Sequence, residues 1–237
     1  ARDAMFNMDD SKIFTTCQQE PKGMAVIDVE ARKEIKMVPI KGGRAGGMDP
    51  QGKYFMVSAS KSVHFFDSQT AELVKTIKVP GGGGNFTCLK DGSKCYVGLR
   101  KANAVGVIDM AKLELMKTIE TGPDANRLYL NPGNSRYGLF ANEAGKSDIV
   151  SIIDTQLDVK VKDIWTGLGP HNVAFDPDGK FAVISTKKEN VATLVDTGSA
   201  DPNDWDVITT DLDSGIQNNG VRWVPSPAAL KKALAQN

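Results

Sequence analysis

The 237-residue sequence predicts an all-β protein built from repeated units of four short strands. One marker is a turn that ends in a basic residue before an apolar run, as in Asp49–Lys53 (DPQGK) and Asp176–Lys180 (DPDGK). A second marker is a pair of apolar residues followed by aspartate, as in Val26-Ile27-Asp28. Each marker occurs five times, at intervals of 39 to 45 residues. Two independent markers that keep one period indicate internal repetition.

Each repeat has the texture of four strands. The runs Tyr54–Ser58 (YFMVS) and Phe181–Ser185 (FAVIS) are apolar and bounded by turn residues, and the later runs of each repeat end in aspartate or alternate. Four strands in about 40 to 45 residues are typical of a propeller blade. Because a lone blade cannot bury both faces, blades stack around an axis. The predicted fold class is therefore a β-propeller of four-stranded blades.

The number of blades is open at the C-terminal side. Five complete repeats run from about Ala4 to Leu212, and Asn219–Pro225 (NGVRWVP) is similar to the inner strand of a sixth. Ser226 and Pro227 then provide the N-cap and first residue of a predicted short helix. We predict a propeller domain over residues 1–225 and a helical extension over residues 226–237. Either five blades close with the extra strand and helix, or the chain is part of a propeller of roughly six to eight blades. The second is favoured because an open sheet edge invites aggregation.

The best-preserved repeat carries a family resemblance. It reads Gly167-x-x-Pro-x-x-Val-x-x-Asp-Pro-Asp-Gly-Lys180, then Ile184-Ser185 and Leu194-Val195-Asp196, and it resembles the YVTN-type β-propeller family. The repeat around Asn131 departs from this pattern by an inserted turn residue, and the first repeat lacks the Gly-Pro lead. The resemblance implies a periplasmic or extracellular protein. Relatives of this type include surface-layer modules, lactonases and propeller subunits of periplasmic redox enzymes, among them haem d1 proteins.

Charge and hydropathy exclude two classes of partner. Lys+Arg and Asp+Glu number 29 each, so the formal net charge is zero. Nucleic acids and anionic membrane surfaces both favour a basic excess. No apolar run approaches the roughly 18 residues that a membrane span requires. We therefore predict no nucleic-acid partner and no membrane span.

Two of the three cysteines flank one of the turns, in Cys88–Cys95 (CLKDGSKC). Directly opposed Cβ atoms in a hairpin lie about 4.5–5.5 Å apart, close to the span of a disulfide. A disulfide is therefore one interpretation, and two small apolar residues on neighbouring strands is the other. Cys17 has no evident partner, and we expect a buried thiol.

A polar position recurs at the start of the inner strands. In propellers, function usually lies at the mouth of the central channel, where the loops that lead into these strands converge. The residues in this phase are Arg44, Asn85, Asn126, His171 and Asn219, with Arg127 beside Asn126. Such a ring could bind an anion, a small polar ligand or a metal, and Arg44 can contact a carboxylate or phosphate with two hydrogen bonds. The alternative is that these side chains only satisfy exposed backbone and channel water.

Other polar motifs favour structural interpretations. Gly81–Gly84 is followed by a strand rather than a helix, so it is not a phosphate loop, and we expect a flexible loop beside the channel. His64 lies within a predicted strand, which favours a sheet residue over a metal ligand. The carboxylates of Asp201–Asp204 and Asp211–Asp213 could bind calcium but more often cap turns.

The aspartates of the second marker recur in every repeat, which favours a turn-stabilising hydrogen bond over catalysis. They are Asp28, Asp67, Asp109, Asp154 and Asp196. The sequence contains no Cys-x-x-Cys-His, Gly-x-Ser-x-Gly or His-Glu-x-x-His motif. We predict no catalytic residue, metal site or cofactor, with a haem d1-type cofactor or a bound metal left as alternatives.

Two classes of function remain. The favoured one is a non-catalytic binding or scaffold subunit of an exported assembly, with a redox assembly as one option, in which another chain covers the open edge or the C-terminal helix. The other is an enzyme that uses the channel mouth, either a lactonase-like hydrolase or the cofactor domain of an oxidoreductase. Arg44 and His171 are the residues on which the enzyme hypothesis depends.

Overall fold

The computed structural model describes residues 2–143, 145 and 147–213. The predicted sixth inner strand at residues 219–225, with Asn219, and the predicted helix from Ser226 lie outside the described residues. In the part that is described, the chain consists of strands, turns and two short 3₁₀ helices. No helix there has the length and hydrophobicity that crossing a bilayer requires.

Twenty strands form five antiparallel sheets, and each sheet takes four consecutive strands in sequence order. We call these sheets blades 1 to 5. The strands are β1 (Ala4–Phe6), β2 (Lys12–Cys17), β3 (Gly23–Asp28), β4 (Lys33–Pro39), β5 (Ala45–Met48), β6 (Tyr54–Ser58), β7 (Ser62–Asp67), β8 (Leu73–Lys78), β9 (Phe86–Cys88), β10 (Lys94–Leu99), β11 (Ala104–Asp109), β12 (Glu114–Glu120), β13 (Ala125–Leu130), β14 (Tyr137–Asn142), β15 (Ile149–Asp154), β16 (Val159–Trp165), β17 (Pro170–Phe175), β18 (Phe181–Thr186), β19 (Val191–Asp196) and β20 (Asp206–Asp213). The helices are η1 (Arg100–Ala102) and η2 (Pro202–Asp204).

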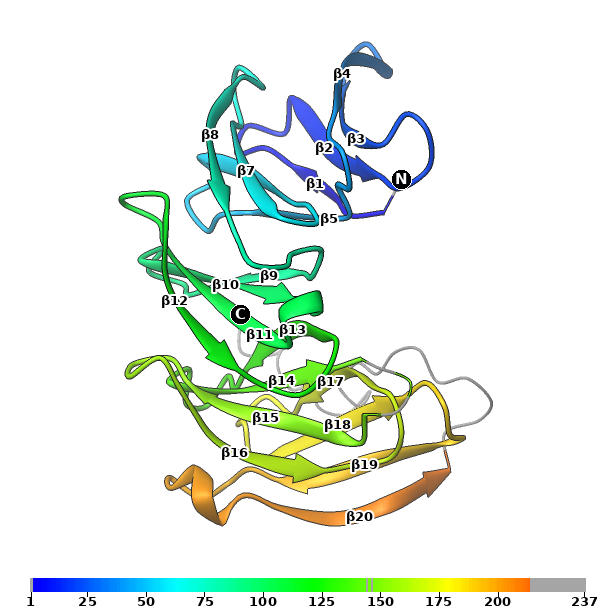
Figure 1. Ribbon diagram of the computed structural model, residues 1–237, viewed down its shortest axis with the longest axis vertical. Helices are drawn as coiled ribbons and strands as arrows, with labels where there is room; N and C mark the ends of the chain where they lie inside the picture. The colour runs from blue at the N-terminus through cyan, green and yellow to red at the C-terminus, as the bar shows by residue number, and fades with distance from the viewer. Residues whose placement is uncertain (1, 144, 146, 214–237) are drawn as a thin grey trace, which may run out of the picture.

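The five blades follow one another in an open arc. Figure 1 shows blade 1 (blue) and blade 5 (yellow to orange) at opposite ends of the long axis of the molecule. The first strands of neighbouring blades lie next to each other: the Met48 amide donates to Met5 Sδ over 3.1 Å, and the Thr87 hydroxyl donates to the Leu128 carbonyl over 2.7 Å. This arrangement confirms the predicted all-β propeller architecture of four-stranded blades.

The core lies between the blades. Phe14 of blade 1 packs on Phe55 of blade 2 with ring centroids 5.2 Å apart, and Tyr137 of blade 4 packs edge-on against Trp205 of blade 5 at 6.0 Å. Trp205 is only 1% exposed. Full burial of one large apolar side chain contributes roughly 1.5–3 kcal/mol. Stacking of blades therefore supplies the burial that a single blade cannot provide.

The recurring aspartates hold turns, as the sequence predicts. Asp67 Oδ1 accepts the amides of Gln69 and Thr70 over 2.9 and 2.8 Å. The same side-chain-to-amide bonds are made by the other four members, Asp28, Asp109, Asp154 and Asp196. Asp201 likewise accepts the Asn203 amide over 2.9 Å and caps η2.

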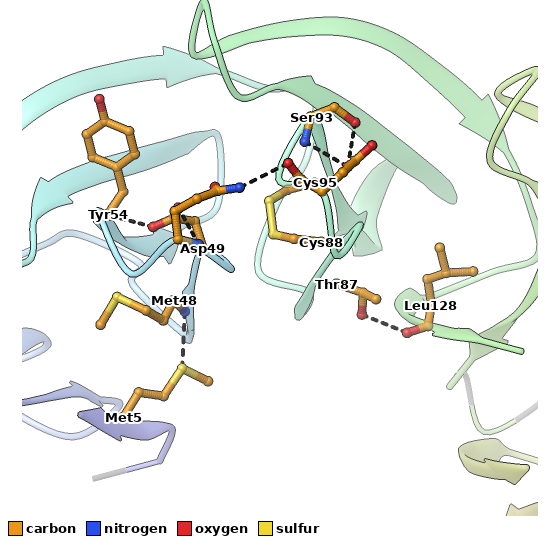
Figure 2. Close-up of a disulfide and its surroundings, with 11 residues drawn as sticks. Met5, Met48, Asp49, Tyr54, Thr87, Cys88, Ser93, Cys95 and Leu128 are labelled. Carbon is orange, nitrogen blue, oxygen red and sulfur yellow. Dashed lines mark hydrogen bonds between the residues drawn. A yellow bond between two sulfur atoms is a disulfide. The ribbon is translucent and has the colours of Figure 1, made fainter. Parts of the chain in front are cut away.

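The remaining predicted features fall within the blades. Cys88 and Cys95 are directly opposed on β9 and β10 and form a disulfide (Figure 2), whereas Cys17 is a free thiol that is half-buried rather than fully buried. His64 lies in β7, where its Nε2 and Nδ1 atoms bond the hydroxyls of Ser62 and Thr76 over 2.9 and 3.1 Å. Burial lowers the pKa of His64, which fits a neutral sheet residue.

The arc has two distinct ends. We call the mouth end the one at which the first strand of each blade begins, together with the loops between second and third strands. The turn end carries the turns between first and second strands and between third and fourth strands. Each first strand runs from the mouth end to the turn end, as β5 does from Ala45 to Met48.

Candidate functional site

A pocket of about 310 Å³ opens at the mouth end between blades 2 and 3. Its walls come from the loops that enter β5 and β9, from the loop after β6, and from η1. It is lined by Gly42, Arg44, Ser60, Gly82, Gly83, Arg100, Lys101 and Asp124. Three of these side chains are cationic and one is acidic, so the pocket is basic.

The glycine run beside the pocket is tightly packed. Gly81–Gly84 are all buried, and the Gly83 amide donates to Ser58 Oγ over 2.8 Å. A Cβ atom on Gly82 would lie 2.0 Å from the carbonyl oxygen of Ala59, so only glycine fits there. Close contacts with neighbouring residues therefore explain the glycines at this position, and the flexibility expected of the loop stays a prediction. This packed loop forms one wall of the pocket.

Arg44 is the exceptional cation of the pocket. Its backbone is fixed because its amide donates to the Ser58 carbonyl over 3.0 Å and its carbonyl accepts from Gln18 Nε2 over 3.3 Å. Among the described residues, no carboxylate forms an ion pair with its guanidinium. Burial, then repulsion from Arg100 and Arg2, lowers the pKa of Arg44, although Glu143 and Asp124 oppose this. Arg44 is thus a half-buried positive charge whose field is not neutralised by a contacting acid.

Arg100, by contrast, is fully paired. It begins η1 directly after β10, and its Nη1 donates to Glu143 Oε2 over 2.6 Å. Its Nη2 bonds Asp124 Oδ2. The side chains of Arg100 and Glu143 are only 12% and 11% exposed. These two acids hold the guanidinium in one orientation at the edge of the pocket.

Glu143 pairs with side chains from blades 3 and 5. Its carboxylate pairs with Arg100, with Lys187 and with His171, whose Nε2 lies 3.3 Å from Glu143 Oε1. Burial alone would raise the pKa of Glu143, but hydrogen bonds from Lys187 and Arg100 outweigh it and lower the pKa to about 2. Glu143 therefore stays ionised at neutral pH and acts as the counter-ion of the mouth end.

The residues predicted from the sequence occupy the mouth end in different roles. Asn85 Nδ2 donates to Asn126 Oδ1 over 3.1 Å, and Arg2 Nη2 donates to Asn85 Oδ1 over 3.4 Å. Arg127 is exposed and lies over the Tyr129 ring at 5.3 Å. Arg44 lines the pocket, and His171 pairs with Glu143.

The sequence analysis missed the charges that organise this end. Arg100, Glu143 and Lys187 share one phase, because each follows directly after the second strand of its blade. The corresponding residue of blade 2 is Ala59. A comparison of second-strand ends between repeats would have found this charged set, whereas the comparison of first-strand starts did not.

The donor set of the mouth end does not favour a metal. Within the described residues, no three His, Cys, Asp or Glu side chains come close enough together to hold a metal ion. The pocket instead combines the packed wall of Gly81–Gly84 with two guanidinium groups. That of Arg44 has no contacting acid among the described residues, and that of Arg100 is held by two acids. Guanidinium groups bind carboxylates and phosphates through paired hydrogen bonds.

Comparison with known proteins identifies the fold class. No protein-family model matches the chain, and a search of curated protein sequences gives no match. Among solved structures, the chain is similar to Kuenenia stuttgartiensis hydrazine synthase at 24% identity and a TM-score of 0.61, over 74% of this chain and 51% of that chain. It therefore spans about half the length of that protein.

Two further structures are similar. A putative 6-phosphogluconolactonase from Bacteroides fragilis matches at 19% identity and a TM-score of 0.70, over 91% of this chain and 70% of that chain. A functionally unknown protein from Desulfotomaculum acetoxidans matches at 14% identity and a TM-score of 0.66, over 83% of this chain and 67% of that chain. At these identities the likeness concerns the fold alone, and together with the five blades it places the chain among the β-propellers.

Proposed function

We propose that this chain is a non-catalytic β-propeller binding subunit that holds an anionic group of a ligand or partner protein in the mouth-end pocket. The observation that carries the proposal is Arg44, which lines the pocket half-buried and without a contacting acid among the described residues. Even partial burial of a charge without a contacting acid is costly, so a site that retains one favours a ligand of opposite charge.

The rest of the pocket supports an anion. Asp124, its one acidic lining residue, is already bonded to Arg100, and Lys101 adds a further exposed cation at the rim. A volume of about 310 Å³ accommodates a carboxylate or phosphate with a small organic body. We therefore infer a small carboxylated or phosphorylated molecule, or an acidic side chain of a partner protein.

The electrostatics favour binding over acid–base catalysis. An effective general base has a pKa near the working pH, whereas the pKa of Glu143 is about 2. His171 lies against this carboxylate, which is itself shared with Lys187 and Arg100. The Glu143 carboxylate is therefore better suited to holding cations in place than to transferring a proton.

The wider role that we propose is that of a subunit in an exported assembly. A disulfide between Cys88 and Cys95 suits an oxidising compartment outside the cytoplasm. One similar structure is named hydrazine synthase, and the proposal that the assembly is a redox enzyme is drawn by analogy with that name. The YVTN-type family assignment and the periplasmic or extracellular location belong to this proposal. Native mass measurement and pull-down from the source organism test it, because a monomer without a co-purifying chain would contradict the subunit role.

Calorimetric titration tests the pocket itself, with inorganic phosphate and citrate as probes. We expect Arg44→Gln to weaken binding at least about tenfold, since a charge-assisted hydrogen bond contributes roughly 1.5–3 kcal/mol. Arg32→Gln is the matched control, because Arg32 is exposed in the β3–β4 turn at the opposite end. Equal binding by both variants would overturn the assignment of the pocket.

A lactonase-like hydrolase is the second candidate. It is favoured by the similarity to the putative 6-phosphogluconolactonase over 91% of this chain, and a basic pocket suits a phosphorylated lactone. Hydrolysis of 6-phosphogluconolactone can be followed by proton release at constant pH. If the chain is such an enzyme, the double change Arg44→Ala and His171→Ala abolishes turnover while leaving thermal stability nearly unchanged. If the unaltered protein does not accelerate hydrolysis above the uncatalysed rate, this candidate is excluded and the binding role remains.

A further inference from the structure

The turns between first and second strands follow one rule in four blades. The residue that heads each turn is Asn or Asp, and its side chain accepts backbone amides of the turn. Asp49 Oδ1 accepts the Tyr54 amide over 2.5 Å, and Asp176 Oδ1 accepts the Phe181 amide over 2.8 Å. Asn7 Oδ1 likewise accepts the Lys12 amide in blade 1, and Asn131 Oδ1 accepts the Gly133 and Asn134 amides within the turn of blade 4.

Blade 3 breaks this rule at Leu89. The backbone bonds of the turn are unchanged, because the Leu89 amide donates to the Lys94 carbonyl and the Gly92 amide donates to the Leu89 carbonyl, each over 2.9 Å. Leucine, however, offers no side-chain acceptor. In this blade alone, Cys88 and Cys95 bracket the turn with a disulfide. Figure 2 shows the two solutions together, Asp49 bonded to Tyr54 in blade 2 and the disulfide in blade 3.

A cavity of about 640 Å³ lies beside this turn, at the turn end between blades 3 and 4. Where the head residue is asparagine, it also bridges to the next blade, since Asn7 Nδ2 donates to the Ser68 carbonyl and Asn131 Nδ2 donates to the Gly179 carbonyl. Leu89 cannot make such a bridge. Its side chain lines the cavity with Leu130 and Pro132 of blade 4, which gives the cavity an apolar surface.

Three cationic residues, Lys90, Lys94 and Arg136, line the cavity beside this apolar surface. Lys94 and Arg136 are held by ion pairs with Asp158 and Asp154. Arg136 uses its Nε and Nη2 atoms for Asp154, which leaves its Nη1 atom without a hydrogen bond among the described residues. Lys90 is exposed and forms no ion pair within the described part of the chain. The acidic residue of the cavity, Asp91, turns its carboxylate to the Ser93 amide and hydroxyl over 3.0 and 2.8 Å.

We propose that the cavity is a second binding site, which takes a compact amphipathic anion. The apolar body of this ligand packs on Leu89, Leu130 and Pro132, and its carboxylate or sulfonate meets Lys90 and the free edge of Arg136. The disulfide fixes the wall of the site because it encloses residues 89–94, most of which line the cavity. A volume of about 640 Å³ lies in the range of small-molecule sites. The site is independent of the mouth-end pocket, since it lies at the other end of blade 3.

Fluorescence titration of the full chain with 1-anilinonaphthalene-8-sulfonate tests the proposal, because this probe joins an aromatic body to one sulfonate. We expect saturable binding of one probe per chain. Leu89→Asp, which introduces the aspartate that heads the turns of blades 2 and 5, and Lys90→Glu each weaken binding at least about tenfold. Lys180→Glu, an exposed lysine in the equivalent turn of blade 5, leaves it unchanged. Arg44→Gln also leaves it unchanged, which separates this site from the proposed function.

The role of the disulfide has its own variant. Cys88→Ser/Cys95→Ser is expected to weaken probe binding about fivefold while the thermal transition stays cooperative. If Leu89→Asp fails to fold, Lys90→Glu against Lys180→Glu decides the question, because both are surface charge reversals. Non-saturable binding, or equal affinity of the Lys90→Glu and Lys180→Glu proteins, would overturn the proposal.

Discussion

The two ends of the blades are organised by different interactions. At the turn end, the same hydrogen bonds recur from blade to blade, as Asp67 and Asp154 illustrate with their neighbouring amides. At the mouth end, charges that occur once each come together from several blades, with Glu143 between Arg100 and Lys187. The recurring contacts of the turn end are local to a repeat, whereas the ion pairs of Glu143 at the mouth end join different repeats.

This difference separates fold from function. A contact that every repeat makes stabilises the repeat, because each copy needs the same turn. A charged residue that appears in one copy does nothing for the other blades, so its placement reflects what that region binds or holds. By this criterion, two features at the turn end behave like the mouth end: Leu89 with its disulfide, and the ion pair of Lys94 with Asp158 between blades 3 and 4. Variants at both ends can test the criterion through their effects on stability.

The largest expected loss of stability comes from Glu143→Gln. The variant leaves Arg100, Lys187 and His171 close together without their shared counter-ion, and loss of one partner from a buried ion pair costs about 3 kcal/mol. Urea unfolding measures this loss. Glu72→Gln is the control, because its pair with Lys36 is exposed and contributes at most about 1 kcal/mol. Similar losses of unfolding free energy in both variants would show that the ion pairs of Glu143 stabilise the fold no more than an exposed surface pair does.

The same carboxylate gives the mouth end a pH dependence. The folded-state pKa of Glu143, about 2, lies below its unfolded value, so its stabilisation is fully present above the unfolded value and is lost as the pH falls through the folded value. We expect the difference in unfolding free energy between the unaltered protein and Glu143→Gln to shrink from about pH 4.5 towards pH 2. Urea unfolding at several pH values measures it. A difference that does not change with pH would contradict the ion-pair role.

At the turn end, the largest effect is expected from removal of the disulfide. The bond between Cys88 and Cys95 closes a short loop, and the chain-entropy relation gives about 2.5 kcal/mol for a loop of this length. Cys88→Ser/Cys95→Ser should lower the unfolding free energy by this amount. Cys17→Ser is the control, because that free thiol contributes no cross-link. If Cys88→Ser/Cys95→Ser and Cys17→Ser have the same unfolding free energy, the disulfide does not stabilise the fold.

Much of the fold could be predicted from the sequence because the same pattern of strands and turns occurs five times. The turn aspartates and the strand runs recur, so Asp28 or Asp196 could be assigned a turn role by comparison alone. The exception at Leu89 was hidden by the choice of marker. Aligning the turns by their basic residues matches Lys94 with Lys53, whereas the hydrogen bonds match Leu89 with Asp49.

The mouth end was only partly predictable. Arg44, Asn85 and Asn126 were found because they share a phase at first-strand starts, and Asn85 and Asn126 do meet. The pairing of His171 with Glu143 depends on a loop of blade 4 reaching the first strand of blade 5. Periodicity within a repeat carries no information on which loops of neighbouring blades touch, so that contact required the structure.

Replacement of the turn head gives a smaller effect. In the disulfide-free protein, Leu89→Asp should have an unfolding free energy about 1 kcal/mol higher than Leu89→Ala, because an aspartate can accept the turn amides as Asp176 does. Leu89→Ala is the matched control, since it removes the same leucine side chain without adding an acceptor. Urea unfolding of the two variants compares them directly. If the two variants have the same unfolding free energy, the rule of the other four turns does not apply to blade 3.

Arg44→Gln is expected to change stability least, by no more than about 0.5 kcal/mol, as for substitutions outside a structural network. Its guanidinium is half-buried beside Arg100 and Arg2, so its removal relieves repulsion while it removes packing. Saturating phosphate should then distinguish the proteins, because a ligand that binds only the folded state raises the unfolding free energy. We expect phosphate to stabilise the unaltered protein and not Arg44→Gln, as measured by thermal shift. A mouth-end charge that stabilises nothing until an anion arrives is what distinguishes a binding residue from Glu143, which holds the fold in the absence of ligand.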